Sequence, residues 1–309
     1  MKLATVSLNG LSSAVVVLNS GSLLNIAHAA TTTTYPGAEF LKCGSMQKII
    51  SGGSLAIQAL YDLVTKAEAG VLTQYVHAVG ESELMAPIPV PKKNIFCVGR
   101  NYAEHIAEGE KAQNVKIGVT EHPVFFTKPP TSIVSPGDDV LIFSSISEAI
   151  DYEVELAVVI GKPGRNIAKT DAYNHIFGYT ILNDITARDI QRRHGGQYFK
   201  GKGLDGSCPV GPWIVTADEI SNPSNLSIGL TVNGEKRQDG NTSDMIFDIP
   251  TIIASLSEGM TLEAGDIIAT GTPSGVGYAM EPPVFLKSGD TVVCNVSEIG
   301  TLTNTVRTV

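Results

Sequence analysis

The sequence predicts a mixed, β-rich α+β fold, with a small amino-terminal α+β domain at residues 1–90 and a larger domain at residues 91–309. Beyond residue 90, short apolar runs bounded by Pro and Gly are typical of strands. Helical segments there are too few for a regular alternation of strands and helices. The chain has 309 residues, of which 43% are hydrophobic and 17% charged, so it is long enough to bury a sizeable core.

The amino-terminal region is expected to begin with a β-hairpin. The apolar run at residues 14–18 is short, and the Asn-Ser-Gly turn at residues 19–21 interrupts it. The Ala-His-Ala triplet at residues 27–29 has the pattern of a signal-peptide cleavage site, but the apolar run before it favours a strand instead. Helical segments are predicted at residues 46–50 and 54–67.

Residues 86–94, APIPVPKKN, are expected to form an extended linker. Prolines stand there at alternate positions, and each proline restricts its own backbone and that of its predecessor. The domain boundary is therefore expected near residue 90. Strands are predicted downstream at residues 94–99, 123–129, 138–143, 151–161, 178–186, 266–273 and 290–306.

Two helices and a hairpin complete the expected elements of the larger domain. Asn233-Gly234 is a strong signal for the turn of a hairpin over residues 226–240. A short helix is predicted at residues 169–177. An amphipathic helix is predicted at residues 249–259, where Pro suits the first turn and Gly the end.

Composition excludes several classes of protein. A formal net charge of -9 without a long Lys/Arg run argues against nucleic acid as a partner. The sequence has no apolar run of 18 or more residues, so no membrane span is expected. Cys43, Cys97, Cys208 and Cys294 are far apart and form no C-x-x-C pair, which argues against a disulfide framework or a zinc site. Reduced thiols in a cytoplasmic protein are expected.

The stretch IDYEVELAVVIGK at residues 150–162 carries three acids before an apolar run. On one strand Asp151, Glu153 and Glu155 share a face about 7 Å apart, and they repel unless solvated, protonated or bridged by a cation. An edge strand with a wet face is one reading. Asp184, at the end of another apolar run and followed by Asp189, favours a second reading, a site for Mg²⁺ or Mn²⁺.

Six motifs occur together and in order: GRNYAEHIAE, DYEVELAVVIGK, NDITARDIQ, GSCPVGP, VNGEKRQDGNTSDMIF and GDIIATGTPSGVG. Over residues 92–309 they resemble the fumarylacetoacetate hydrolase family. The resemblance implies a β-roll or β-sandwich catalytic domain that depends on a metal. Residues 1–90 resemble the small amino-terminal domain of longer members, including a branch described as oxaloacetate decarboxylases.

The resemblance implies that Glu153, Glu155 and Asp184 bind Mg²⁺ or Mn²⁺. Asp151 is not a ligand in the family pattern, so it is expected beside the ligands or facing solvent. These assignments agree with the strand argument, which placed three carboxylates near one another from the sequence pattern.

His105 and Glu108 match the catalytic dyad of the family, and their i, i+3 spacing places them on one face of a helical turn. Lys202 matches a lysine that stabilises developing oxyanion charge. Lys200 lies two residues away and is an alternative. Residues 203–204 are Gly-Leu where many members carry Ser-Phe, a departure that affects the local geometry.

Further residues are expected to line the substrate pocket. Gln191 and Thr272 match substrate-contacting positions of the family, and Arg188 is expected to pair with nearby acids or to contact substrate. Arg100 and Tyr102 are expected in the same pocket. The glycine-rich loop at residues 271–277 lacks the G-K-[ST] of a P-loop, so it is either a tight turn or a set of N–H groups for a carboxylate. Residues 109–122 are expected to form part of a lid.

The resemblance implies a metal-dependent enzyme acting on a small keto acid, in a homodimer. Hydrolysis of a C–C bond in an acylpyruvate or related diketo acid, through a metal-stabilised enolate, is the first hypothesis. Oxaloacetate decarboxylation or keto–enol tautomerisation at the same site is the alternative. A metabolite-binding protein without catalysis on the same fold is the third reading, because a fold does not dictate a function.

Overall fold

The structure is a computed structural model that describes residues 1–8, 10–78, 83–116 and 118–309. In these ranges a large mixed sheet has twelve strands, of which ten follow the order β4-β3-β2-β1-β14-β12-β11-β17-β6-β7. A second sheet of five strands has the order β16-β15-β18-β19-β9. Most neighbouring strands are antiparallel, which confirms the predicted β-rich α+β fold.

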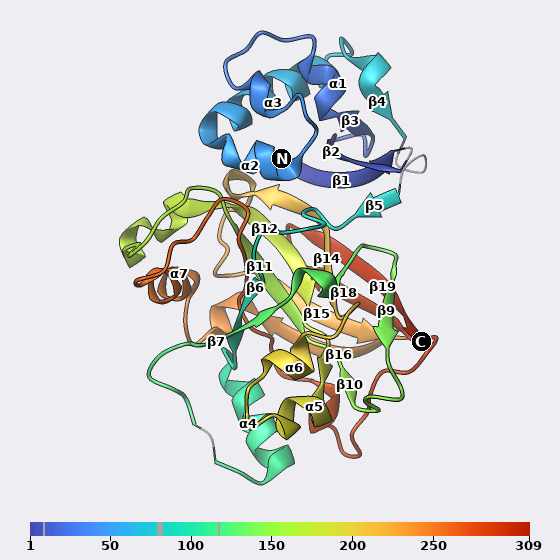
Figure 1. The fold of residues 1–309 in the computed structure, drawn as a ribbon, viewed down its shortest axis with the longest axis vertical. Coiled ribbons are helices and arrows are strands. Elements are labelled where there is room, and N and C mark those ends of the chain that lie inside the picture. Colours follow the sequence, from blue (N-terminus) through green and yellow to red (C-terminus); the bar gives the residue numbers. More distant parts are fainter. Residues whose placement is uncertain (9, 79–82, 117) are drawn as a thin grey trace.

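The amino-terminal unit holds strands and helices at one end of the molecule (Figure 1). Its elements are β1 (Lys2–Leu8), β2 (Leu11–Val17), β3 (Leu23–Asn25), α1 (Ile26–Ala30), α2 (Met46–Ser51), α3 (Gly53–Glu68), β4 (Val76–His77) and β5 (Glu83–Met85). The predicted hairpin is β2–β3, and both predicted helices form. Strand β1 was not predicted. Residues 27–29 lie in α1, where Ala29 and Ala30 are buried.

The central part of the large sheet carries segments of three of the six motifs: DYEVELAVVIGK, GSCPVGP and GDIIATGTPSGVG. Its strands are β6 (Ile95–Gly99), β7 (Val124–Lys128), β8 (Ile133–Val134), β11 (Val154–Ile160), β12 (Ile176–Asn183), β14 (Cys208–Thr216) and β17 (Ile267–Ala269). A separate pair consists of β10 (Ile150–Asp151) and β13 (Thr186–Ala187). The strand predicted at residues 151–161 is thus interrupted at residues 152–153, between β10 and β11.

The five-stranded sheet packs beside the central strands. It consists of β9 (Asp139–Ile142), β15 (Ser227–Val232), β16 (Glu235–Asn241), β18 (Thr291–Val296) and β19 (Gly300–Thr308). Asn233 and Gly234 both have positive φ, at 53° and 80°, and form the predicted tight turn between β15 and β16.

Among the described residues after position 100, the α-helices are α4 (Ala103–Gln113), α5 (Arg188–Arg193), α6 (Phe199–Lys202) and α7 (Ile249–Ser257). The predicted helix at residues 169–177 is the 3₁₀ segment η5 (Lys169–His175). Helix α7 begins at Asp248, whose carboxylate accepts the N–H of Thr251. None of the helices among the described residues is long and apolar enough to cross a membrane.

Strand β11 is buried on both faces. Leu156, Val158 and Ile160 belong to a core shared with the five-stranded sheet, whereas Ala157 and Val159 belong to a core shared with α2 and α3. This alternation follows from the two-residue period of a strand. The strand is therefore a rigid support for the acids at its beginning.

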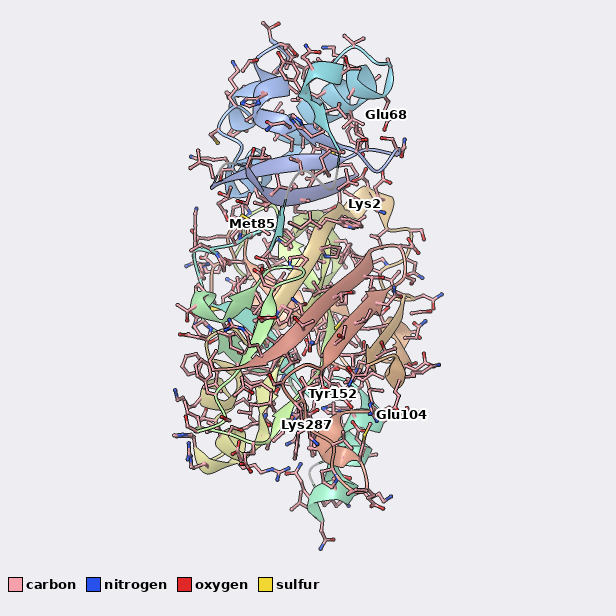
Figure 2. All side chains as sticks on the ribbon, turned by 90° about the vertical axis from the view of Figure 1, so that its right-hand side faces the viewer. Lys2, Glu68, Met85, Glu104, Tyr152 and Lys287 are labelled. Atoms are coloured by element: carbon pink, nitrogen blue, oxygen red, sulfur yellow. The ribbon has the colours of Figure 1, made fainter. Side chains whose placement is uncertain are left out.

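The amino-terminal unit and the following chain share one sheet, because β1 pairs with β14. Figure 1 shows α4, α5 and α6 at the end of the molecule away from this unit. In Figure 2, Lys2, Glu68 and Met85 lie toward one end and Glu104 toward the other. The amino-terminal unit therefore does not cover the region around α4.

Candidate active site

Three buried carboxylates meet at one end of the central strands. Glu155 lies on β11, Glu153 just precedes this strand, and Asp184 directly follows β12. Val154 pairs with Asn183, so the beginning of β11 meets the end of β12. One oxygen from each carboxylate lies within 4.8 Å of the others.

The wet edge strand proposed as one reading is wrong. Strand β11 lies between β12 and β17, and its acids are buried. Asp151 does not face solvent either: its carboxylate accepts the Nε–H of Arg188 at 2.8 Å and the N–H groups of Gly277 and Tyr278 at 2.7 and 3.0 Å. These charge-assisted bonds stabilise a carboxylate that burial alone would disfavour.

Buried cations neutralise two of the three acids. Lys202 Nζ donates to Glu153 Oε2 and to Asp184 Oδ2, both at 2.7 Å. Lys128 Nζ lies 3.0 Å from Asp184 Oδ1, as an ion pair without the geometry of a hydrogen bond. Arg188 Nη2 lies 2.7 Å from Glu153 Oε1 in the same manner.

The two glutamates differ electrostatically. Burial acts to raise the pKa of Glu153, but the charges of Lys202 and Arg188 overcome it and lower the pKa to about 2. Burial, followed by the charges of Asp184 and Glu153, raises the pKa of Glu155 well above its ordinary value. Among the described residues no Lys or Arg forms an ion pair with Glu155. Glu155 is thus the carboxylate of the cluster whose negative charge no neighbouring cation of the described residues pairs with.

The residues fit a divalent cation. All three donors are carboxylate oxygens, which hard cations such as Mg²⁺ prefer. In an octahedron with bonds of about 2.1 Å, neighbouring oxygens are roughly 3.0 Å apart and opposite oxygens roughly 4.2 Å. One oxygen each of Glu153, Glu155 and Asp184 lies within 4.8 Å of the others, so the three carboxylates are close enough to converge on one ion.

Helix α4 carries a second catalytic candidate. His105 Nδ1 lies 2.7 Å from Glu108 Oε1, and Glu108 Oε2 accepts the N–H of Gly275 at 2.8 Å. Because the carboxylate is an acceptor, the hydrogen is assigned to Nδ1. The lone pair of Nε2 is then free to accept a proton.

The loop at residues 271–277 uses its N–H groups for carboxylates of the protein itself. Gly271 donates to Glu155 at 2.6 Å, while Gly275 and Gly277 donate to Glu108 and Asp151. Gly271 and Gly275 have φ of 102° and 106°, a region that favours glycine. Of the two readings of this loop, the structure therefore shows N–H groups that hold side chains rather than a simple tight turn.

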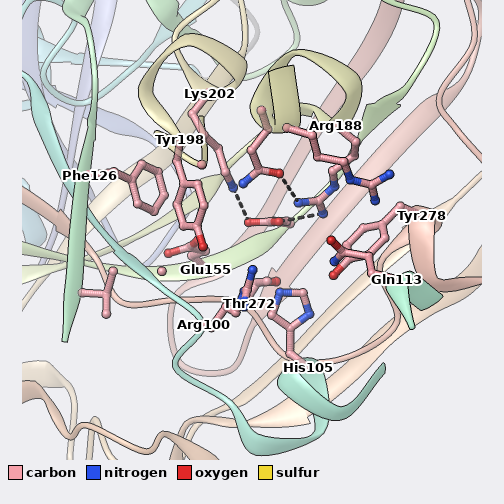
Figure 3. Close-up of a pocket in the computed structure, with 16 residues that line it drawn as sticks. Arg100, His105, Gln113, Phe126, Glu155, Arg188, Tyr198, Lys202, Thr272 and Tyr278 are labelled. Carbon is pink, nitrogen blue, oxygen red and sulfur yellow. Dashed lines mark hydrogen bonds and ion pairs between the residues drawn. The ribbon is translucent and has the colours of Figure 1, made fainter. Parts of the chain in front are cut away.

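A pocket of about 250 Å³ lies between these groups. Figure 3 shows Lys202 and Arg188 on one side of it and Thr272 and His105 on the other. The sequence-predicted residues that line it are Arg100, His105, Glu153, Glu155, Arg188, Gln191, Lys202 and Thr272.

Other predicted residues lie outside the lining of the pocket. Glu108 and Asp184 lie behind it, where Glu108 contacts His105 and Asp184 contacts Lys202. Tyr102, expected in the pocket, is buried away from it, and its hydroxyl has no hydrogen-bond partner among the described residues. Lys200 is exposed and does not line it, so the geometry favours Lys202 over Lys200.

Sequence reasoning missed several residues of the site. The pocket is also lined by Gln113, Phe126, Arg192, Tyr198 and Tyr278, and Lys128 lies behind it. Lys128 had a readable signal, since it ends the apolar run VFFTK. Of the expected lid at residues 109–122, the first part belongs to α4, and Ile117 lies outside the described residues.

Comparison with known proteins places the chain in a family. The family model described as fumarylacetoacetate (FAA) hydrolase C-terminal matches residues 94–307. The oxaloacetate tautomerase YisK of Bacillus subtilis (strain 168) is 52% identical over 236 residues, which cover 76% of each chain.

Solved structures agree with this match. A fumarylacetoacetate hydrolase from Exiguobacterium antarcticum has a TM-score of 0.80 and 38% identity, covering 100% of both chains. A maleylpyruvate hydrolase from Sphingobium sp. SYK-6, in complex with manganese (II) and pyruvate, has a TM-score of 0.76 and 31% identity, covering 100% of this chain and 99% of that one. The chain belongs to the fumarylacetoacetate hydrolase family.

Proposed function

We propose that the protein is a keto–enol tautomerase for a small keto acid of the oxaloacetate type, with Mg²⁺ or Mn²⁺ at Glu153, Glu155 and Asp184. The observation that carries the proposal is His105, whose Nδ1 is engaged by Glu108 while the ring lines the same pocket as the acids. The similarity to an oxaloacetate tautomerase supports this reading over C–C bond hydrolysis as the first choice.

Proton transfer by His105 is the central step. When bound, the divalent cation supplies Lewis-acid polarisation of the keto acid oxygens. His105 Nε2 removes a proton from the carbon beside the keto group, and the C–H electrons form the new C=C bond. The carbonyl oxygen takes up the negative charge and then receives the proton that His105 holds, which gives the enol and returns His105 to its neutral form. The reverse reaction follows the same path.

Lys202 stabilises the charge that develops on that oxygen. Its ammonium group lines the pocket and uses two N–H groups on Glu153 and Asp184. One N–H therefore remains for substrate, in a buried position where a charge-assisted bond is strong. Glu108 keeps the imidazole in the required tautomer and orientation.

Hydrolysis of a C–C bond remains the second candidate. A solved relative is named a maleylpyruvate hydrolase, and a histidine held by a glutamate also suits activation of water. Decarboxylation of oxaloacetate releases CO₂ and leaves the enolate of pyruvate, which is also the enolate that cleavage of an acylpyruvate releases. The paired dyad argues against the third reading, a binding protein without catalysis.

An assay that resolves products separates these reactions. Oxaloacetate, acetylpyruvate, fumarylpyruvate and a keto-sugar acid are each followed for enol–keto exchange, cleavage and CO₂ release. We expect the enzyme to catalyse enol–keto exchange of oxaloacetate at a higher rate than Mg²⁺ or Mn²⁺ does without the protein. Cleavage of an acylpyruvate without any exchange would establish the hydrolase instead.

Metal binding is tested separately from turnover. Saturation with Mn²⁺ at about 100 times its Kd stabilises the folded state by roughly 2.7 kcal/mol. Glu155→Gln should abolish most of the accompanying rise in the melting temperature. An unchanged rise in that variant would contradict the proposed ligand set.

The remaining assignments are also proposals. We propose that Gln191 and Thr272 contact substrate, that residues 1–90 and 91–309 are distinct domains, and that the protein is a cytoplasmic homodimer. The resemblance to the family supports the domain division and the dimer. The buried thiols of Cys97, Cys208 and Cys294 suit a reducing compartment.

A further inference from the structure

Two arginines of the pocket wall have guanidinium groups without an anionic partner in the part of the chain that the structure describes. Arg188, the third arginine there, is buried and pairs with Asp151 and Glu153. Arg100 and Arg192 also line the pocket, yet neither forms a hydrogen bond or an ion pair with a residue that the structure describes. Their donors therefore remain available to a ligand in the cavity.

Helix α5 and Tyr278 position Arg192. Arg192 follows Arg188 by four residues, so both side chains leave the same face of the helix. Their guanidinium carbons lie 4.4 Å (Arg188) and 5.6 Å (Arg192) from the centroid of the Tyr278 ring. A cation–π contact restrains an exposed arginine without using its N–H donors.

The backbone conformation of Arg100 is unusual. Its φ of 53° lies in the left-handed region, which residues with a Cβ rarely adopt. The residue directly follows β6 and precedes α4, which carries His105. Strained backbone at such a place is typical of functional sites.

The two ends of the pocket differ in charge. At the deep end, Lys202 and Arg188 already pair with the carboxylates, and the divalent cation would receive the keto acid group there. Toward the opening, Arg192 lies beside Arg188 on one ring, so positive charge is in excess. An anionic group on the substrate relieves this excess.

We propose that Arg192, together with Arg100, forms a subsite for a second carboxylate, so that the pocket selects keto diacids over keto monoacids. A guanidinium group matches a carboxylate with two parallel N–H donors. This inference deepens the proposed function and rests on it for the position of the reacting end. A pocket of about 250 Å³, small for a ligand site, suits a short diacid.

Binding of unreactive analogues tests the subsite without turnover. Malate and 2-hydroxybutyrate differ in that a methyl group replaces the second carboxylate, and calorimetry with Mg²⁺ present gives both affinities. A charge-assisted pair is worth about ten- to hundredfold in affinity. We expect the intact protein to prefer malate by at least about tenfold.

Arg192→Gln should remove most of this preference, because it lowers the affinity for malate and leaves the affinity for 2-hydroxybutyrate unchanged. Arg193→Gln is the matched control, because Arg193 is exposed on the same helix and does not line the pocket. It removes the same charge and should retain the preference. Arg100→Gln should lower the preference as well.

Several results would overturn the subsite. One is that the intact protein binds the two analogues with equal affinity or binds neither. Another is that Arg192→Gln lowers the affinities for malate and for 2-hydroxybutyrate by the same factor. A preference equally lost in Arg193→Gln would show a general charge effect instead. If the preference is present but oxaloacetate is not tautomerised, only the proposed function fails.

Discussion

Lys128 and Lys202 are ammonium groups in an interior that normally excludes them. Both are almost fully buried, with 0% and 3% of their surfaces exposed. They persist because carboxylates and carbonyl groups surround them: Lys128 Nζ donates to the carbonyl oxygens of Ile185 and Lys202, and Lys202 pairs with Glu153 and Asp184. The site is thus a network in which each buried charge depends on its partners.

His105→Gln should lower kcat for tautomerisation by about 10²- to 10⁴-fold, the usual contribution of a general base. Glutamine retains a polar side chain but cannot accept the proton. Steady-state kinetics with oxaloacetate measures the loss. His175, also buried and in contact with a carboxylate, lies outside the pocket and is the control. A similar loss in His175→Gln would point to a structural cause.

Lys128→Met should lower the free energy of unfolding by about 3 kcal/mol, because it removes a buried cation beside a carboxylate. Asp184 keeps Lys202, so the lower end of the usual range is expected. Combining Lys128→Met with Asp184→Asn should recover part of the loss, since the buried carboxylate that lost Lys128 is then a neutral amide. Urea unfolding of the intact protein, the two single variants and the double variant gives the coupling energy between Lys128 and Asp184. Strictly additive losses of stability would contradict this coupling.

At the scale of elements, strands were predictable where apolar runs end at Pro or Gly. The strand at residues 94–99 illustrates this. The Asn233-Gly234 hairpin and the helices α3 and α7 were predictable from other local signals, namely the turn residues and the helical spacing of apolar residues. The interruption of the strand at residues 152–153 was not predictable, because it depends on pairing of β10 with β13. Strand β1 was missed although its longest pairing is with β2, which follows it in sequence; only its shorter pairing with β14 is remote.

The residues of the site that lie within the six sequence motifs were largely predictable. The acids and the dyad came from contiguous segments of sequence, whereas Lys128 and Tyr278 lie outside those segments and reach the site through tertiary packing. Arg192 directly follows the motif NDITARDIQ and lies four residues after Arg188 on the same helix. Tyr102 lies in the same motif as His105, GRNYAEHIAE, but its side chain is buried and does not line the pocket. Neighbouring positions in a motif can therefore differ in which of them reaches the cavity.

Gly275→Ala should displace the loop that holds the dyad. A Cβ atom there would lie 1.9 Å from the carbonyl oxygen of Arg237, and φ is 106°. The N–H bond to Glu108 should weaken, so kcat and the melting temperature should both fall. Gly259→Ala is the control, since its φ of 68° is also positive but nothing lies within 4 Å. It should cost about 1 kcal/mol of stability and leave kcat unchanged.

At the scale of the whole molecule, one sheet joins the two parts of the chain. Strand β1 pairs with β14, and Leu3 and Ile214 belong to the same core cluster as residues of α2, α3 and β11. Helices α4 and α5, which carry His105 and Arg188 of the pocket wall, lie at the opposite end (Figure 1). The core that the two parts share is thus separated in space from the pocket.

Leu3→Ala should lower the free energy of unfolding by about 2–5 kcal/mol, as for other large-to-small core changes. Because the core is shared, Leu3→Ala and Ile214→Ala should each shift one cooperative transition and leave kcat/KM unchanged. Leu11→Ala is the control, as this side chain is 74% exposed. Calorimetry measures the transitions. Two separate transitions, with only one shifted by Leu3→Ala, would show that the amino-terminal unit unfolds independently.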